Sequence, residues 1–110
     1  MEPIIRYERD VHKGETLEMG FEYTWLTTLV GASASMGIKD RDSGALLTTL
    51  TLGDGLTITD LWVNVSVSAA RTEMMTPGRV YYADIKLTLA SGVVIIAPDI
   101  QINARARQTS

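Results

Sequence analysis

Apolar and polar side chains alternate along several stretches of this chain. Because successive side chains of a β-strand point to opposite faces, such alternation is typical of strands with one face buried and one face in water. The clearest stretches are residues 16–25, 61–68, 81–89 and 100–107. Shorter strands are expected at residues 33–39, 45–52, 56–59 and 93–97. The dominant period therefore predicts β-structure along most of the chain.

Turn-forming residues separate these stretches, as expected for a chain that reverses direction between short strands. One segment, residues 68–76, is predicted to be a short helix, because Ser68 can cap it and Pro77 with Gly78 ends it. We therefore predict an all-β fold: a two-sheet antiparallel β-sandwich, Ig-like or jelly-roll-like, of about seven or eight short strands with one short connecting helix. A small closed barrel fits the same local pattern and stays open as the alternative.

The chain has the size of one domain, since its 110 residues suit a single core. We divide it into an N-terminal arm at residues 1–12, a β-sandwich domain at residues 13–107 and a C-terminal tail at residues 108–110. The first residues are rich in charge, which predicts no secretory signal. No apolar run approaches the ~20 residues that a membrane-spanning helix needs.

The composition excludes several kinds of catalytic and metal site. There is no cysteine, and His12 is the single histidine. Disulfides, thiolate metal sites and cysteine nucleophiles are thus excluded, and a metal centre would lack ligands, so we expect no cofactor and no enzyme activity. The acidic segment at residues 40–44 resembles a calcium loop only superficially, and we expect a polar hairpin turn there. The net charge of −3 argues against nucleic-acid binding.

Aromatic and basic side chains at positions that should face water are the candidate partner-binding residues. Trp62 and Tyr82 stand on the polar sides of their strands, and such aromatic side chains are frequent in protein–protein hot spots. The alternative is that a loop or the N-terminal segment covers them. Basic side chains near the two ends are further candidates for docking, the alternative being solvated chain ends. These basic residues are Arg6, Arg9, Arg105 and Arg107.

A series of motifs carries a family resemblance. It begins with a Lys-Gly-Glu-Thr turn before an alternating strand, and continues with an acidic hairpin turn, a Gly-Asp-Gly-Leu-Thr-Ile step and a short helical turn followed by Pro-Gly. A strand with two tyrosines, a Ser-Gly turn and a final pair of strands ending in arginine complete it. These motifs lie at residues 13–17, 34–44, 53–58, 63–78, 79–92 and 93–107. In this order they resemble a family of small bacteriophage virion β-sandwich proteins, although residues 28–31 only approximate the family's Asp-Leu-Thr-Gly step.

The resemblance implies a virion structural protein. Relatives serve as capsid cement (staple) proteins or as tail or baseplate adaptors, and a single bare domain with charged ends favours a cement protein that decorates and stabilises the outer capsid surface. The implied partners are the major capsid protein and other copies of this chain, including a homodimer, with no nucleic acid, membrane or small-molecule substrate. The implied location is the capsid surface of the virion, after synthesis in the host bacterial cytoplasm.

Two other functions stay open. The first is a tail or baseplate adaptor, which would have the same fold. The second is a carbohydrate-binding β-sandwich module, in which Trp62, Tyr81 or Tyr82 would be the stacking platform.

Overall fold

The computed structural model describes residues 6–106, which form an all-β fold with one short helix, as predicted. Eight strands join in a single sheet in the order β1-β8-β7-β3-β4-β5-β6-β2. The strands are β1 (Arg6–His12), β2 (Leu17–Glu22), β3 (Ser33–Asp40), β4 (Leu46–Leu52), β5 (Gly55–Thr59), β6 (Trp62–Val67), β7 (Val80–Thr88) and β8 (Val94–Arg105). The helix is α1 (Ala69–Thr72).

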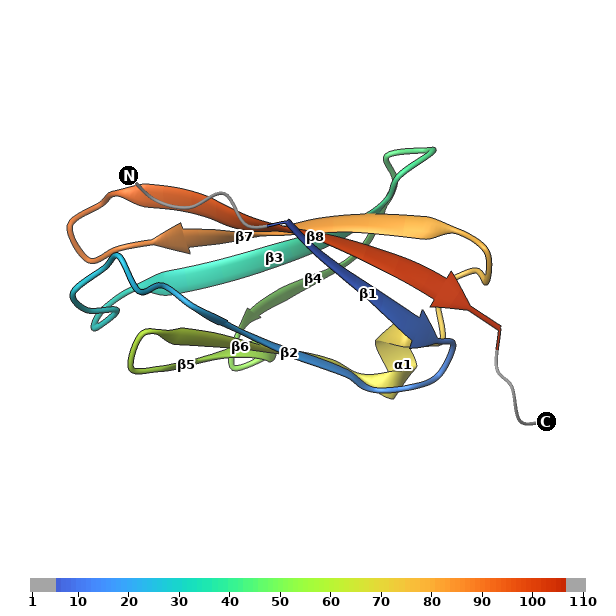
Figure 1. Ribbon diagram of the computed structural model, residues 1–110, viewed down its shortest axis with the longest axis horizontal. Coiled ribbons are helices and arrows are strands. Elements are labelled where there is room, and N and C mark those ends of the chain that lie inside the picture. The colour runs from blue at the N-terminus through green and yellow to red at the C-terminus, as the bar shows by residue number, and fades with distance from the viewer. Residues whose placement is uncertain (1–5, 107–110) are drawn as a thin grey trace.

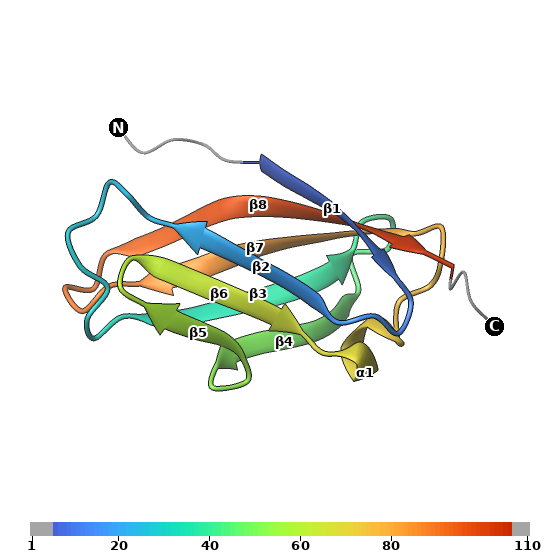
Figure 2. The same cartoon turned by 60° about the horizontal axis from the view of Figure 1, so that its bottom comes forward.

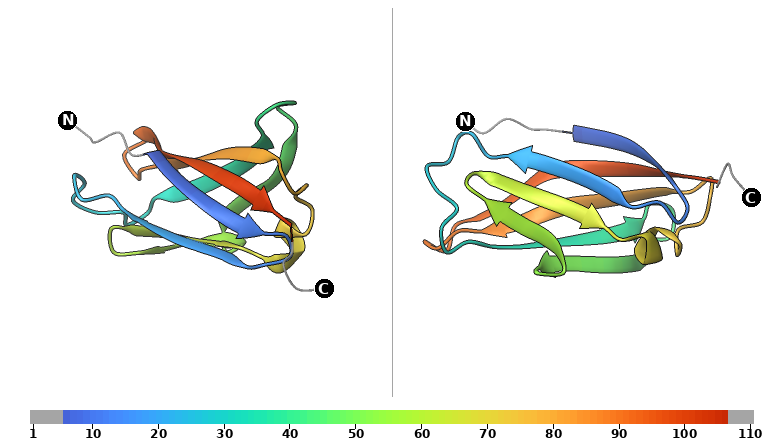
Figure 3. Two further views of the ribbon diagram at one scale, coloured as in Figure 1. Left: turned by 45° about the vertical axis from the view of Figure 1, so that its right-hand side comes forward. Right: turned by 90° about the horizontal axis from the view of Figure 1, so that it is seen from below.

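The sheet curls until it is nearly closed on itself. β8, β7 and β3 lie on one side of the core, and β5, β6 and β2 lie on the other (Figure 1). On one flank, only two residue pairs join β4 to β5. On the other flank β1 and β2, the two ends of the sheet, lie next to each other (Figures 2 and 3) without strand pairing between their described residues. We call this line between β1 and β2 the seam.

The inward-facing side chains of both halves make the core. In β7 the alternation turns Tyr81, Ala83, Ile85 and Leu87 inward, as the sequence predicts. Burial of one large apolar side chain stabilises a fold by about 2 kcal/mol. The shared core therefore holds the two halves together at the seam, where strand pairing is missing. Its largest buried side chains are Tyr23, Met36, Ile38, Leu50, Leu56, Met75, Ile85, Leu87, Ile100 and Ile102.

β8 joins two strands that the alternation predicts as separate. One strand, Val94–Arg105, includes most of both predicted stretches, 93–97 and 100–107, and the residues between them. The inward positions change from odd, at Ile95, to even, at Ile100, so the strand must accommodate one extra residue between them. The pairing of β8 with β7 shifts register at this place. A change of phase within one strand looks, in a sequence, like the boundary between two.

The described part of the expected N-terminal arm, residues 6–12, is a strand of the sheet. It is β1, and it pairs with β8 in parallel along its whole length. Among its described side chains only Val11 is fully buried, so the apolar alternation that marks a strand is too weak to see. β4 and β5 also pair in parallel, so the predicted antiparallel arrangement holds only for the other neighbours. The alternation along one strand does not encode the direction of the next.

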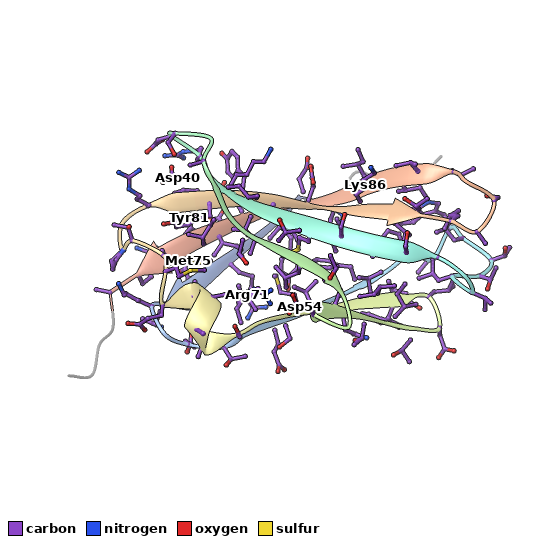
Figure 4. All side chains as sticks on the ribbon, turned by 180° about the vertical axis from the view of Figure 1, so that it is seen from behind. Asp40, Asp54, Arg71, Met75, Tyr81 and Lys86 are labelled. Carbon is purple, nitrogen blue, oxygen red and sulfur yellow. The ribbon has the colours of Figure 1, made fainter. Side chains whose placement is uncertain are left out.

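α1 is shorter than the predicted helical segment, but it begins at the predicted cap. The Ser68 side chain accepts a hydrogen bond from the Arg71 N–H at 3.2 Å. Arg71 Nε then donates to Thr48 Oγ1 at 2.9 Å, and Arg71 Nη2 donates to Asp54 Oδ2 at 2.9 Å (Figure 4). Arg71 thereby ties the helix to β4 and to the β4–β5 turn, on the flank where strand pairing is short.

Candidate functional site

Arg9 bridges the seam and is not part of a free arm. Its Nη1 donates to the backbone oxygen of Glu18 at 3.2 Å, from β1 to β2. Two residues earlier in β1, the ring of Tyr7 meets the ring of Phe21 edge to face, with centroids 5.2 Å apart. Side chains thus connect the two strands across the seam. The geometry gives Arg9 a role inside the molecule.

Arg105 belongs to a polar network on the outer side of β1 and β8. The Asn103 amide donates to Glu8 Oε2 at 2.8 Å and to Asp10 Oδ1 at 2.9 Å. Arg105 Nη2 lies 3.5 Å from Asp10 Oδ2. The hydrogen bond from Asn103 is the largest effect on Asp10 and lowers its pKa; desolvation opposes it, and the charge and hydrogen bond of Arg105 add to the lowering, so the pKa is lowered overall. Arg105 stays exposed, so its charge is available to a partner as well.

Tyr82 faces water as predicted, with 40% of its surface exposed on the outer side of β7. It borders a groove of about 480 Å³ over β3, β7 and β8, at a point where Gly37 supplies no side chain. Charged side chains of both signs also line this groove. They are Lys39, Asp84, Lys86 (labelled in Figure 4) and Asp99. Such a mixture of charges favours no single class of ligand.

Trp62 also faces water as predicted, with 41% of its surface exposed on the outer side of β6. Its six-membered ring lies against Gly20 of β2: a Cβ on Gly20 would come 3.3 Å from Cε3 and 3.4 Å from Cζ3 of the ring. A groove of about 530 Å³ runs over β2, β5 and β6 beside it. Trp62 is therefore packed against the sheet on one side and open on the other.

Tyr81, the third aromatic candidate for a stacking platform, lies in the core. Only 2% of its surface is exposed, and its hydroxyl accepts a hydrogen bond from the Thr76 N–H at 2.8 Å. It packs with Met75 beneath the end of the sheet (Figure 4). A ligand cannot stack on a ring in this position. The suggestion that Tyr81 is a stacking platform is therefore wrong, and Tyr81 is a core residue.

One end of the molecule carries an apolar patch that the alternation did not single out. It lies where the β7–β8 turn meets the loop between β2 and β3 (Figure 1), and a Cβ on Gly31 would be 3.1 Å from the Cβ of Ala90. The sequence did contain a signal for this patch. Residues 93–96 are all apolar, and because successive side chains of a strand alternate between its two faces, some of them must face water. The exposed side chains here, which we call the apolar tip, are Val30, Val93, Val94 and Ile96.

The predicted partner-binding residues do not converge on one site. The two aromatic residues lie on opposite sides of the core, on β6 and β7 (Figure 1). Arg9 belongs to the seam and Arg105 to the polar network on β1 and β8. Arg6 is the first residue of β1, and Arg107 lies outside the described residues. The surface thus offers several separate places for contact.

Acidic side chains of the described region are spread over the surface. Between residues 6 and 106, no three His, Cys, Asp or Glu side chains gather where they could hold a metal ion. Several of the acidic groups form surface ion pairs, such as Asp40 with Arg79 at 2.8 Å. No helix in this part of the chain is long and apolar enough to cross a membrane.

Comparison with known proteins gives a likeness of fold. No model of a known protein family matches the chain. No curated protein matches it. Among solved structures, the chain is similar to the crystal structure of CopC from Methylosinus trichosporium OB3b, with 10% sequence identity and a TM-score of 0.50 over 89% of this chain and 85% of that chain. At this level of identity the similarity shows a shared fold alone.

Proposed function

We propose that this protein is a structural component of a bacteriophage virion. More specifically, it is a capsid decoration (cement) protein that binds and stabilises the outer surface of the shell formed by the major capsid protein. The proposal starts from the motifs along residues 13–107, which resemble those of small phage virion β-sandwich proteins. Under it the protein acts through its surface, catalyses no reaction and needs no cofactor. It is made in the host cytoplasm and resides on the capsid.

The apolar tip is the observation that carries this proposal. Single exposed apolar side chains are ordinary on a protein surface, whereas a contiguous group of them marks a contact surface. The tip joins side chains of the β2–β3 loop, the β7–β8 turn and the beginning of β8, and the loop and the turn come close at Gly31 and Ala90. Because it lies at one end of an elongated body (Figure 3), the tip suits attachment end-on to a shell.

A small contact is sufficient when many copies act on one shell. Four side chains bury less than the ~800 Å² per partner of a standard stable interface. Copies bound side by side on a capsid can add contacts with one another, for example as two-fold dimers, and each added contact is effectively intramolecular. We therefore expect weak binding to isolated capsid subunits and tight binding to assembled shells.

We also propose that the fold is a two-sheet β-sandwich, with β1-β8-β7-β3-β4 in one sheet and β5-β6-β2 in the other. The short link of two residue pairs between β4 and β5 supports this description, since neighbours such as β3 and β7 pair along their whole length. In a sandwich the outer faces of the two sheets are separate surfaces. They can then serve different partners.

Co-sedimentation with undecorated capsids tests the cement proposal. The protein at micromolar concentration is expected to pellet with capsids and to stay in the supernatant alone. Val94→Glu and Ile96→Glu are expected to reduce the pelleted fraction at least about tenfold, because a charge in an apolar contact loses its hydration. Met74→Glu is the matched control, since Met74 is an exposed apolar residue near α1 at the other end.

Three results would change the proposal. Protein that ignores capsids and pellets with purified tails would be a tail or baseplate adaptor. Protein that binds neither particle would not be a virion component of this kind. Tip variants that pellet like the wild type would remove the apolar tip as the contact surface.

A further inference from the structure

The outer side of β5, β6 and β2 is a polar face with a single aromatic side chain. Three rows of residues cross these strands, and the middle row runs through Thr57, Asn64 and Gly20, which lie in register. The rows on either side contain Trp62 and Ser66, four residues apart in β6. We call this surface the Trp62 face. Its residues are Glu18, Gly20, Thr57, Trp62, Asn64 and Ser66.

Trp62 forms a stacking platform at one end of this face. The ring packs against Gly20, where any side chain would displace it, and leaves its other side open. The face of an aromatic ring carries partial negative charge, and the C–H groups on one side of a sugar ring carry partial positive charge. A sugar can therefore stack on Trp62. Because the sheet already positions the ring, little side-chain freedom is lost on binding.

Hydrogen-bonding groups without partners line the groove beside the platform. Asn64 is half-buried, and its amide offers both donors and an acceptor. The hydroxyls of Thr57 and Ser66 and the carboxylate of Glu18 surround it. Within the described part of the chain, none of these four side chains makes a hydrogen bond or an ion pair. Sugar hydroxyls donate and accept, so they can satisfy all of these groups.

The dimensions suit a short oligosaccharide. Trp62 and Ser66 are separated by about 13 Å along β6, at ~3.3 Å per residue. The groove volume of about 530 Å³ lies in the range of small-molecule sites. A chain of sugars could thus stack on Trp62 at one end and reach Ser66 and Glu18 at the other.

The charge of the face favours a neutral ligand. The outward positions of β2, β5 and β6 carry no basic side chain, whereas Glu18 and Glu22 add negative charge. The one cation described beside the face is Arg9 of β1, whose guanidinium is hydrogen-bonded to the backbone oxygen of Glu18 at the seam. Phosphates, sulfates and acidic sugars would be repelled. A protein hot spot needs a surround that excludes water, and the neighbours of Trp62 on this face are polar or small. We propose that the Trp62 face binds a neutral saccharide, an activity separate from the virion role because it uses a surface other than the apolar tip.

An array of neutral and acidic oligosaccharides, probed with the full chain, tests this proposal. We expect the protein to bind neutral glycans on the array. The neutral glycan that binds most strongly is then used in a calorimetric titration. Trp62→Ala should lower the affinity at least about tenfold, and Asn64→Ala should lower it several-fold. Gly20→Ala should also weaken binding, because the added methyl group would lie 3.2 Å from Asn64 Oδ1 and 3.3 Å from the Trp62 ring and would push on both without removing either. Tyr82→Ala is the matched control, an equally exposed aromatic residue on the opposite side.

A titration of the wild-type protein with this glycan, monitored by nuclear magnetic resonance, tests the site without relying on the folding of a variant. The indole N–H of Trp62 and the side-chain amide of Asn64 should shift when the neutral glycan is added. Binding of no glycan, or of acidic glycans only, would overturn the proposal. So would neutral-glycan binding that leaves these two signals unmoved and survives Trp62→Ala. Loss of capsid co-sedimentation in Trp62→Ala would assign the face to a protein partner instead.

Discussion

Gly55 lets the chain pass from β4 into β5 at a corner of the sheet. Its φ of +99° lies in the region that side-chain-bearing residues rarely adopt. A Cβ on Gly55 would also collide with the side chain of Leu50 and lie 3.1 Å from the backbone oxygen of Ser66. Leu50 is fully buried and has no room to yield. Conformation and space both require glycine here.

Gly55→Ala is therefore expected to lower the free energy of unfolding by about 3 kcal/mol, from backbone strain and overpacking together. Gly53→Ala is the matched control. The φ of Gly53, +82°, would strain an alanine in the same way, but nothing lies within 4 Å of the added carbon. We expect a loss of about 1 kcal/mol there. Urea denaturation measures both values. Equal losses would show that the contact with Leu50 contributes nothing.

Tyr23 keeps its hydroxyl in the core, where it donates to the backbone oxygen of Ala97 at 2.6 Å. Tyr23→Phe should lower the free energy of unfolding by about 1 kcal/mol at neutral pH. Burial raises the pKa of Tyr23 above its ordinary value of 10.0. The unfolded chain then ionises first, so the contribution of this hydroxyl is complete below pH 10 and is lost as the pH rises further. Denaturation midpoints should show the two proteins converging in alkaline solution, and a constant gap would contradict this account.

Among the elements, the turn between β3 and β4 is the polar hairpin turn that the sequence predicts. Asp40 Oδ1 accepts from the Asp42 N–H at 2.8 Å, and Asp40 Oδ2 accepts from Arg79 Nη1 at 2.8 Å. Desolvation raises the pKa of Asp40, but the N–H groups of Asp42 and Ser43 and the Arg79 guanidinium outweigh it, so the pKa is lowered overall. The turn follows from local residue types. The link to Arg79, 39 residues along the chain, does not.

Asp40→Asn should make the protein less stable at neutral pH, since the amide carries no charge for Arg79. Because the folded pKa of Asp40 lies below its ordinary value of 3.8, the carboxylate stabilises the fold above that pH and loses this effect as the pH falls through the folded value. Thermal unfolding at decreasing pH should show the variant and wild type converging. Asp42→Asn is the control, because its carboxylate meets only the exposed Arg41 at 3.4 Å. A difference that persists in acid would contradict the role of ionisation.

Elements with one buried face could be predicted from the sequence, and the others could not. β2, β6 and β7 alternate clearly, which also placed Trp62 and Tyr82 correctly on the outer side. β1 was not predicted as a strand, because Val11 is the one fully buried side chain among its described residues. The bridge from Arg9 to Glu18 and the packing of Trp62 on Gly20 depend on which strands are neighbours. Alternation along a strand carries no such information.

For the whole molecule, the seam is the place where strands are bonded on one edge only. β7 pairs with β3 and β8, whereas β1 pairs with β8 alone and β2 with β6 alone. Amide hydrogen exchange, measured by nuclear magnetic resonance, should therefore be slower in β7 than in β1 and β2. Arg9→Ala should speed exchange in β1 and β2, whereas Lys86→Ala, which removes an exposed basic side chain of β7 outside the seam, should not. Equal protection of β1 and β7 would contradict this expectation.

The free edges of β1 and β2 lie along the same seam, where Arg9 and the ring pair of Tyr7 and Phe21 bridge them. Open strand edges recruit foreign strands and can seed fibres, and natural proteins prevent this by covering an edge or by placing a charge within it. Here side chains of β1 reach across to β2, and the charged guanidinium of Arg9 lies at the seam between the two edges. We therefore expect a small all-β protein built in this way to reach a high local concentration without its strand edges joining into fibres.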